Sequence, residues 1–61
     1  MKVREIIKLI EAHGWYRIKA KGGHRQYKHY ERPGRVTVPG KMSAVLDRKT
    51  EKSILRQAGV E

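Results

Sequence analysis

The sequence predicts one small α+β domain, in which a three-stranded antiparallel sheet packs against two helices on one of its faces. Three patterns in the 61 residues lead to this fold class. Apolar residues recur at helical spacing near both ends, apolar and polar residues alternate through the middle, and glycine or proline turns divide that middle part into three segments. Covering one face of the sheet with both helices is the simplest way to bury all the apolar stripes.

The first helix is predicted over residues 3–13. Its apolar face has the i, i+3, i+4, i+7 spacing and consists of Val3, Ile6, Ile7 and Ile10. Gly14 stands where a left-handed residue ends a helix. We expect His13 to cap this helix end, and Trp15 to anchor the core or the edge of the sheet.

The first strand begins at Trp15, where the period of the sequence changes to two. Alternation places Tyr16, Ile18 and Ala20 on one side and Arg17, Lys19 and Lys21 on the other. The first set predicts the half-buried side and the second a cationic face. The Gly22-Gly23 pair that follows predicts a hairpin turn into a second strand.

The second strand is predicted over residues 24–30 and the third over residues 36–38. Alternation in the second strand gives one side with His24, Gln26 and Lys28 and another with Arg25, Tyr27 and His29. Tyr27 is expected in the core, while Tyr30 is a candidate for stacking on unpaired bases. Turns at residues 32–34 and 39–40 delimit the third strand.

The last third of the chain predicts one further helix over about residues 50–57. Its inner face consists of Ile54, Leu55 and Ala58, and Gly59 is the expected C-terminal stop. Residues 41–49 have no assignable pattern, although Met42, Val45 and Leu46 are suited to packing beneath the sheet.

Size and composition limit the kinds of protein this chain can be. A 61-residue chain without cysteine has a thin core and no disulfide or thiolate framework, so we expect oligomerisation or a partner protein. The apolar stretches are far too short to cross a bilayer, and no signal-peptide pattern opens the chain, which predicts a cytoplasmic protein.

The charge balance indicates a polyanionic partner, with nucleic acid as the leading candidate. Fifteen Lys and Arg oppose six Asp and Glu, for a net charge of +9. Between residues 17 and 35 the only acidic residue is Glu31, whereas seven residues are basic: Arg17, Lys19, Lys21, Arg25, Lys28, Arg32 and Arg35. The same balance would also serve a solvated surface that maintains solubility.

His24 is the best candidate for chemistry. The sequence has no zinc-type ligand spacing, no pair of carboxylates outside ordinary helix positions and no phosphate-binding P-loop, so we expect no metal and no cofactor. An imidazole transfers protons near neutral pH, and the neighbouring Lys21, Arg25 and Lys28 would hold a phosphodiester. RNA supplies its own 2′-hydroxyl nucleophile, so one histidine is chemically sufficient. Without geometry, His24 is also explained as a hairpin residue or as a phosphate contact without catalysis, and the sequence chemistry alone does not separate these from catalysis.

Taken together, the motifs resemble the HicA-like toxin family along nearly the whole chain. They are an opening helix that ends in Gly-Trp, the Lys-Gly-Gly-His turn, the Val-Thr-Val-Pro strand end and the closing Ser-Ile-Leu-Arg-Gln-Ala-Gly segment. The resemblance implies a double-stranded-RNA-binding-like α-β-β-β-α fold. It also implies a toxin that cleaves messenger RNA and is inhibited by a HicB-like antitoxin.

Within this resemblance, His24 of the Gly22-Gly23-His24 motif takes the family's catalytic role. The residues expected to bind RNA are Lys19, Lys21, Gly22, Gly23, Arg25 and Lys28. Three features differ from many relatives: Arg25 replaces a second histidine, the stretch after Pro39 lacks histidine, and Glu51 replaces an apolar residue. Two other functions stay open on the sequence alone, namely a non-catalytic RNA-binding module and a small DNA-binding or scaffold protein.

Overall fold

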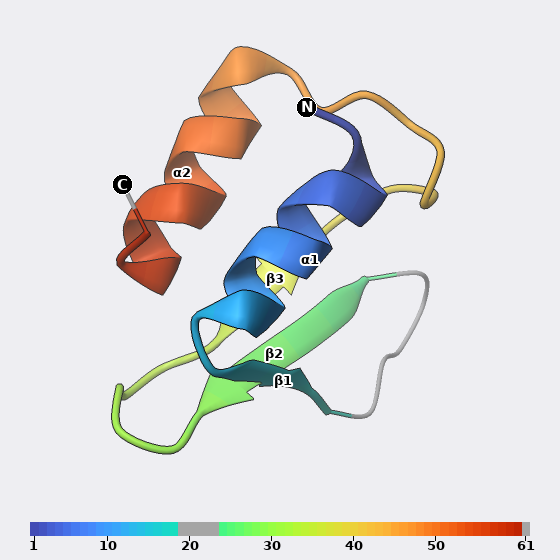
Figure 1. The fold of residues 1–61 in the computed structure, drawn as a ribbon. Helices are drawn as coiled ribbons and strands as arrows, with labels where there is room; N and C mark the ends of the chain where they lie inside the picture. Colours follow the sequence, from blue (N-terminus) through green and yellow to red (C-terminus); the bar gives the residue numbers. More distant parts are fainter. Residues whose placement is uncertain (19–23, 61) are drawn as a thin grey trace.

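The computed structural model describes residues 1–18 and 24–60, and these residues have the predicted order of elements (Figure 1). The two helices and three strands are α1 (Val3–Ala12), β1 (Trp15–Arg17), β2 (Arg25–His29), β3 (Val36–Val38) and α2 (Arg48–Ala58). The predicted α-β-β-β-α fold is therefore confirmed. The Gly22-Gly23 turn and the part of the first strand beyond Ile18 lie outside the described residues.

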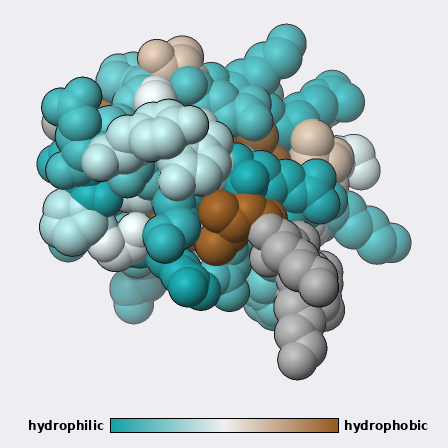
Figure 2. All heavy atoms as spheres, turned by 90° about the horizontal axis from the view of Figure 1, so that it is seen from below, coloured by the Kyte–Doolittle hydropathy of each residue, from teal (hydrophilic) through white to brown (hydrophobic). Residues whose placement is uncertain are grey.

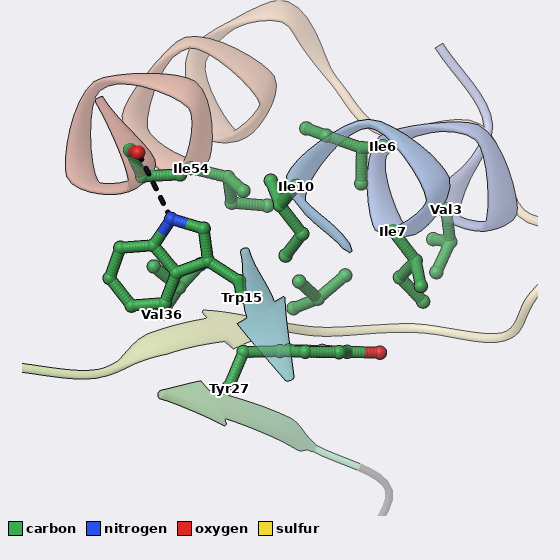
Figure 3. Packing of buried hydrophobic residues seen from close by; sticks show 10 residues of the cluster. Val3, Ile6, Ile7, Ile10, Trp15, Tyr27, Val36 and Ile54 are labelled. Atoms are coloured by element: carbon green, nitrogen blue, oxygen red, sulfur yellow. Dashed lines mark hydrogen bonds between the residues drawn. The ribbon is translucent and has the colours of Figure 1, made fainter. Parts of the chain in front are cut away.

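The three strands form one antiparallel sheet in the order β1-β2-β3, so β2 is central. Trp15 pairs with His29 and Arg17 with Tyr27 across β1 and β2, while Tyr27 pairs with Val36 across β2 and β3. Residues that pair directly across an antiparallel sheet point to the same face. The register thus places Trp15, Tyr27 and Val36 on one face, and this is the face that the helices cover (Figures 1 and 3).

The core lies between that face and the two helices. Four residues of the predicted stripe of α1 are buried, and Tyr27 is the largest of the fully buried side chains at 1% exposure. The complete cluster consists of Val3, Ile6, Ile7, Ile10, Trp15, Tyr27, Val36, Val38, Ile54 and Ala58. Among the described residues, neither helix has the length or apolar character needed to span a membrane.

The buried side of β1 differs from the prediction. Trp15 is 3% exposed, whereas Tyr16, which was expected on the apolar side, is 38% exposed. The larger indole determines which side faces inward, and its Nε1 donates a hydrogen bond of 3.0 Å to the carbonyl of Ala58 at the end of α2 (Figure 3). Arg17 shares the inward side through its pairing with Tyr27, but it lies at the end of the strand and stays exposed.

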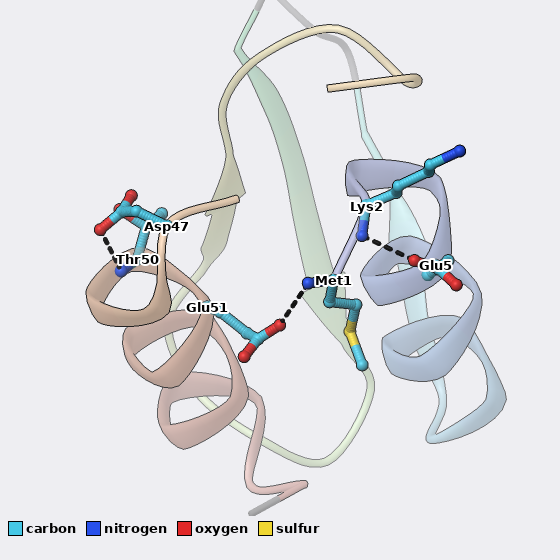
Figure 4. A network of polar contacts seen from close by, with 6 residues as sticks. All are labelled: Met1, Lys2, Glu5, Asp47, Thr50 and Glu51. Carbon is cyan, nitrogen blue, oxygen red and sulfur yellow. Dashed lines mark hydrogen bonds and ion pairs between the residues drawn. The ribbon is translucent and has the colours of Figure 1, made fainter. Parts of the chain in front are cut away.

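The second helix begins at Arg48, two residues before the predicted start, because Asp47 caps it. The Asp47 carboxylate accepts a hydrogen bond of 3.2 Å from the backbone N–H of Thr50 (Figure 4). Gly59 then ends the helix with a φ of 69°, as predicted. The preceding loop is held to α1 by backbone hydrogen bonds, including the one from Val3 to Ala44, and Val45, which was expected to pack beneath the sheet, is 70% exposed.

Candidate active site

His24 lies at the start of β2 with its side chain exposed to solvent. Arg25, the next residue, pairs with Val38, so His24 is beside Pro39 at the end of β3. Within residues 1–18 and 24–60, no side chain or backbone group forms a hydrogen bond with the His24 ring. As far as the described residues are concerned, the exposed imidazole is open to a ligand.

The His24 side chain lines an open groove of about 590 Å³ between β3 and α2. We call this the α2 groove. One wall comes from the sheet and its end, and the other from four residues in the first half and middle of α2 and one in its last turn. The complete lining consists of His24, Thr37, Pro39, Lys49, Thr50, Ser53, Ile54 and Gln57.

The helical wall of the groove is a polar stripe beside the buried one. Thr50, Ser53 and Gln57 recur at i, i+3 and i+7, which places them on one side of α2. The Gln57 carboxamide Nε2 donates a hydrogen bond of 3.3 Å to the Ser53 hydroxyl. Both side chains are exposed, so their remaining donors and acceptors are open to a ligand.

The groove residues on α2 were not among the site residues predicted from the sequence. Residues 41–49 showed no pattern and the helix was expected to start at Thr50, so Lys49 had no assigned place. The Asp47-x-x-Thr50 spacing was the available signal, because Asp is among the preferred N-cap residues. It would have placed Lys49 in the first turn of the helix and the polar stripe of Ser53 and Gln57 behind it.

The predicted RNA-binding residues divide into three groups. Lys28 is exposed on β2. Arg25 is half-buried, on the opposite side of the strand, and its Nη1 donates a hydrogen bond of 2.6 Å to the carbonyl of Gly40. Lys19, Lys21, Gly22 and Gly23 lie outside the described residues.

The other two histidines have structural partners. His13 is the C-cap residue of α1, as predicted, and its Nδ1 lies 2.9 Å from the carbonyl of Leu9. The His29 Nδ1 accepts hydrogen bonds from the backbone N–H groups of Glu31 and Arg32. Its Nε2 therefore carries the proton and donates to the carbonyl of His13 at 2.9 Å. Among the described residues, no group of three metal-ligating side chains is close enough to hold a metal ion.

Two tyrosines form an aromatic pair outside the core. Tyr30 is 87% exposed, and its ring lies 4.8 Å from that of Tyr16, centroid to centroid, with a tilt of 33°. Tyr27, by contrast, is in the core, as expected. Seen from below (Figure 2), the side of the molecule on which the sheet lies in Figure 1 is mostly hydrophilic, with a small hydrophobic area near its centre.

The fold and the groove define a small, basic α+β domain with an exposed histidine at the start of the central strand of its sheet. The family model of the HicA toxin of bacterial toxin-antitoxin systems matches residues 3–60. This covers nearly all of the 61 residues, so the chain belongs to the HicA toxin family. Its place is that of the toxin in a toxin-antitoxin pair, whose partner is an antitoxin. No curated protein matches the chain.

Proposed function

We propose that this toxin is an endoribonuclease that cuts single-stranded stretches of messenger RNA without a metal ion, and that a HicB-like antitoxin inhibits it. The single observation that carries the proposal is the position of His24. Its imidazole is exposed, has no hydrogen-bond partner among the described residues and faces an open groove. A buried or fully hydrogen-bonded ring would not be available to a substrate.

The chemistry needs only proton transfer, alignment and charge stabilisation. In the proposed reaction, the ribose 2′-hydroxyl attacks the adjacent phosphorus and the bond from phosphorus to the 5′ oxygen breaks. His24 either takes the proton from the 2′-hydroxyl or gives one to the 5′ oxygen, and water handles the other proton. The products are a 2′,3′-cyclic phosphate and a 5′-hydroxyl. DNA, which lacks the nucleophile, would not be cut in this way.

Cations of the α2 groove and of β2 would hold the negatively charged RNA backbone. Lys28 and Lys49 are exposed, and the chain has a net charge of +9. We retain Lys19, Lys21, Gly22, Gly23 and Arg25 as proposed contacts to RNA. Arg25 already donates one N–H to the carbonyl of Gly40, so its other guanidinium N–H groups are those offered to phosphate.

The test compares the wild-type protein with His24→Ala under an inducible promoter in bacterial cells. Wild-type expression is expected to stop growth and shorten transcripts, and His24→Ala is expected to lower the cleavage rate by at least about 10²-fold. His13→Ala is the matched control, because His13 is exposed at the end of α1 and outside the groove. It should keep the activity, and co-expression of the antitoxin should restore growth.

Two outcomes would contradict the proposal. Intact transcripts in cells that stop growing would show a toxin that acts by another route. Equal cleavage rates for the wild type and His24→Ala would show that His24 has no catalytic role. Cleavage by the purified protein in the presence of a chelator tests the metal-independent mechanism directly, because a metal-dependent nuclease would lose its activity there.

A further inference from the structure

We propose that the α2 groove binds a nucleobase of the RNA next to the scissile phosphate, and that Ser53 and Gln57 recognise the edge of that base. The inference rests on the proposed ribonuclease function and assigns its substrate contacts to the second helix. The juxtaposition that carries it is the presence of His24 and this polar helical stripe in one groove.

The size and lining of the groove suit a base. A volume of about 590 Å³ lies within the range of roughly 300–1,000 Å³ for small-molecule sites. Pro39 is the partly exposed apolar residue of the lining and Ile54 the buried one, while Thr37, Ser53 and Gln57 supply hydrogen-bonding groups. A nucleobase has the same division, with apolar faces that stack and polar edges that hydrogen-bond.

The Ser53 and Gln57 side chains are arranged to form hydrogen bonds with the edge of a base. Because Gln57 Nε2 donates to the Ser53 hydroxyl oxygen, the carboxamide is oriented before any ligand arrives. It still has one free N–H donor and its Oε1 acceptor, and Ser53 keeps its hydroxyl donor. An amide that offers a donor and an acceptor side by side matches the paired donor and acceptor on a base edge.

Lys49 supplies the charge on the same wall. The backbone N–H groups of Thr50 and Glu51 at the start of α2 already donate to Asp47, to its carboxylate and its carbonyl respectively. An anion at this end of the groove therefore finds the exposed Lys49 ammonium rather than these two N–H groups. We assign the phosphate beside the bound base to Lys49.

The experiment measures RNA binding in the His24→Ala protein, so that cleavage does not interfere. Fluorescein-labelled ten-nucleotide RNAs, one homopolymer for each base, and an abasic ribose-phosphate oligomer of the same length are titrated at fixed salt. We expect the protein to prefer at least one base, and Gln57→Ala to reduce its affinity for that RNA by about fivefold or more. The affinity for the abasic oligomer should stay within twofold. Ser53→Ala should give the same pattern, and Ser43→Ala, in the exposed loop before α2, is its matched control.

Two lysine variants distinguish a contact in the groove from a general effect of positive charge on RNA binding. Lys49→Ala and Lys52→Ala remove the same charge from exposed positions of α2, but only Lys49 lines the groove. Lys49→Ala should weaken binding to all oligomers, the abasic one included, by severalfold more than Lys52→Ala does. Circular dichroism shows whether each variant is folded.

Unchanged base preference in both Gln57→Ala and Ser53→Ala, or equal losses in the two lysine variants, would overturn the inference. This failure is distinct from failure of the ribonuclease function. The wild type could still cleave RNA if the α2 groove bound no base. The binding test does not depend on cleavage. If the nuclease uses the groove, Gln57→Ala with His24 intact should also change which bases stand beside the cut sites, compared with the wild type.

Discussion

Tyr27 shows how burial in the core of this small domain changes the pKa of a side chain. Its ring is 1% exposed in the centre of the sheet, and burial, followed by the nearby Glu11 carboxylate, raises the pKa of its phenol above the ordinary value. Arg17 and Arg25 act in the opposite direction on this pKa but do not cancel the increase. The phenol thus stays neutral in the folded protein at a pH where an unfolded tyrosine, with a pKa of about 10, begins to ionise.

The raised pKa predicts a loss of stability in alkali. Above a pH of about 10 the unfolded chain releases the Tyr27 proton and the folded chain holds it, so the free energy of unfolding falls as pH rises. Urea unfolding of the wild type and Tyr27→Phe between about pH 8 and pH 11 tests this. The wild type should lose stability relative to Tyr27→Phe at the alkaline end, since the other tyrosines are common to both. A pH-independent difference would show that burial does not affect this phenol.

Gly14 and His29 together connect the end of α1 to the turn after β2. Gly14 has a φ of 95°, and a Cβ there would lie 2.6 Å from the His29 Nε2. That ring bridges the end of α1 and the turn after β2, so the glycine is needed both for its backbone conformation and for the close approach of the imidazole. The glycine of the Gly-Trp motif is therefore required by its backbone conformation and by the His29 ring packed against it.

At the scale of elements, α2 is the part on which both the core and the groove depend. It contributes Ile54 and Ala58 to the core and a polar stripe to the α2 groove. Its C-terminal carbonyl at Ala58 accepts hydrogen bonds from the Trp15 indole in β1 and from Arg32 in the turn after β2, which attach this end to the sheet and to that turn. Its N-terminal end is defined by Asp47 and lies close to α1, where the Met1 amino group is 3.0 Å from Glu51 Oε1 (Figure 4).

The Asp47 cap predicts an acid-dependent change in the stability of α2. Hydrogen bonding to Thr50, first to its side chain and then to its backbone N–H, holds the Asp47 pKa below its ordinary value. The charged cap therefore stabilises the fold above the unfolded pKa of about 3.9, and this stabilisation is lost as pH falls through the lower folded pKa. Asp47→Asn keeps a capping side chain without the charge.

Thermal unfolding of the wild type and Asp47→Asn between about pH 7 and pH 2 tests that change. The wild type should be the more stable protein near neutrality, and its advantage should shrink as the pH falls through the folded pKa of Asp47. A constant difference over the whole range would mean that the cap acts without its charge.

At the scale of the whole molecule, charge and chemistry make separate contributions to the proposed function. The net charge of +9 attracts any polyanion, whereas cleavage requires the 2′-hydroxyl beside His24. The two helices cover one face of the sheet (Figure 1), and among the described residues Lys28 and Thr37 on its other face are exposed, so a bound strand has access to them and to the α2 groove.

This separation predicts different results for RNA and DNA of the same sequence. The His24→Ala protein should bind both single strands, with affinities that fall steeply and by similar slopes as salt rises. The wild type should cut only the RNA, and a DNA strand with one ribonucleotide should be cut only directly after that ribose. Gel analysis of labelled strands gives the answer, and cleavage of the all-DNA strand would contradict the proposed nucleophile.

The sequence by itself determined the order and type of the elements. Local rules were enough for this: the spacing of Val3, Ile6 and Ile10 specifies a helical face, alternation places Tyr27 inward, and glycine marks the ends at Gly14 and Gly59. It also identified His24 as the candidate for chemistry, because that prediction needs only a titrating side chain in a basic, turn-forming context.

Only the tertiary structure decided which side of β1 is buried and what faces His24. Trp15 rather than Tyr16 turns inward because its indole meets Ala58, a contact across 43 residues that no local pattern contains. Lys49, Ser53 and Gln57 likewise join His24 only when α2 packs against β3. Periodicity describes neighbours along the chain, whereas a binding site consists of neighbours in space, and these depend on how the helices pack on the sheet.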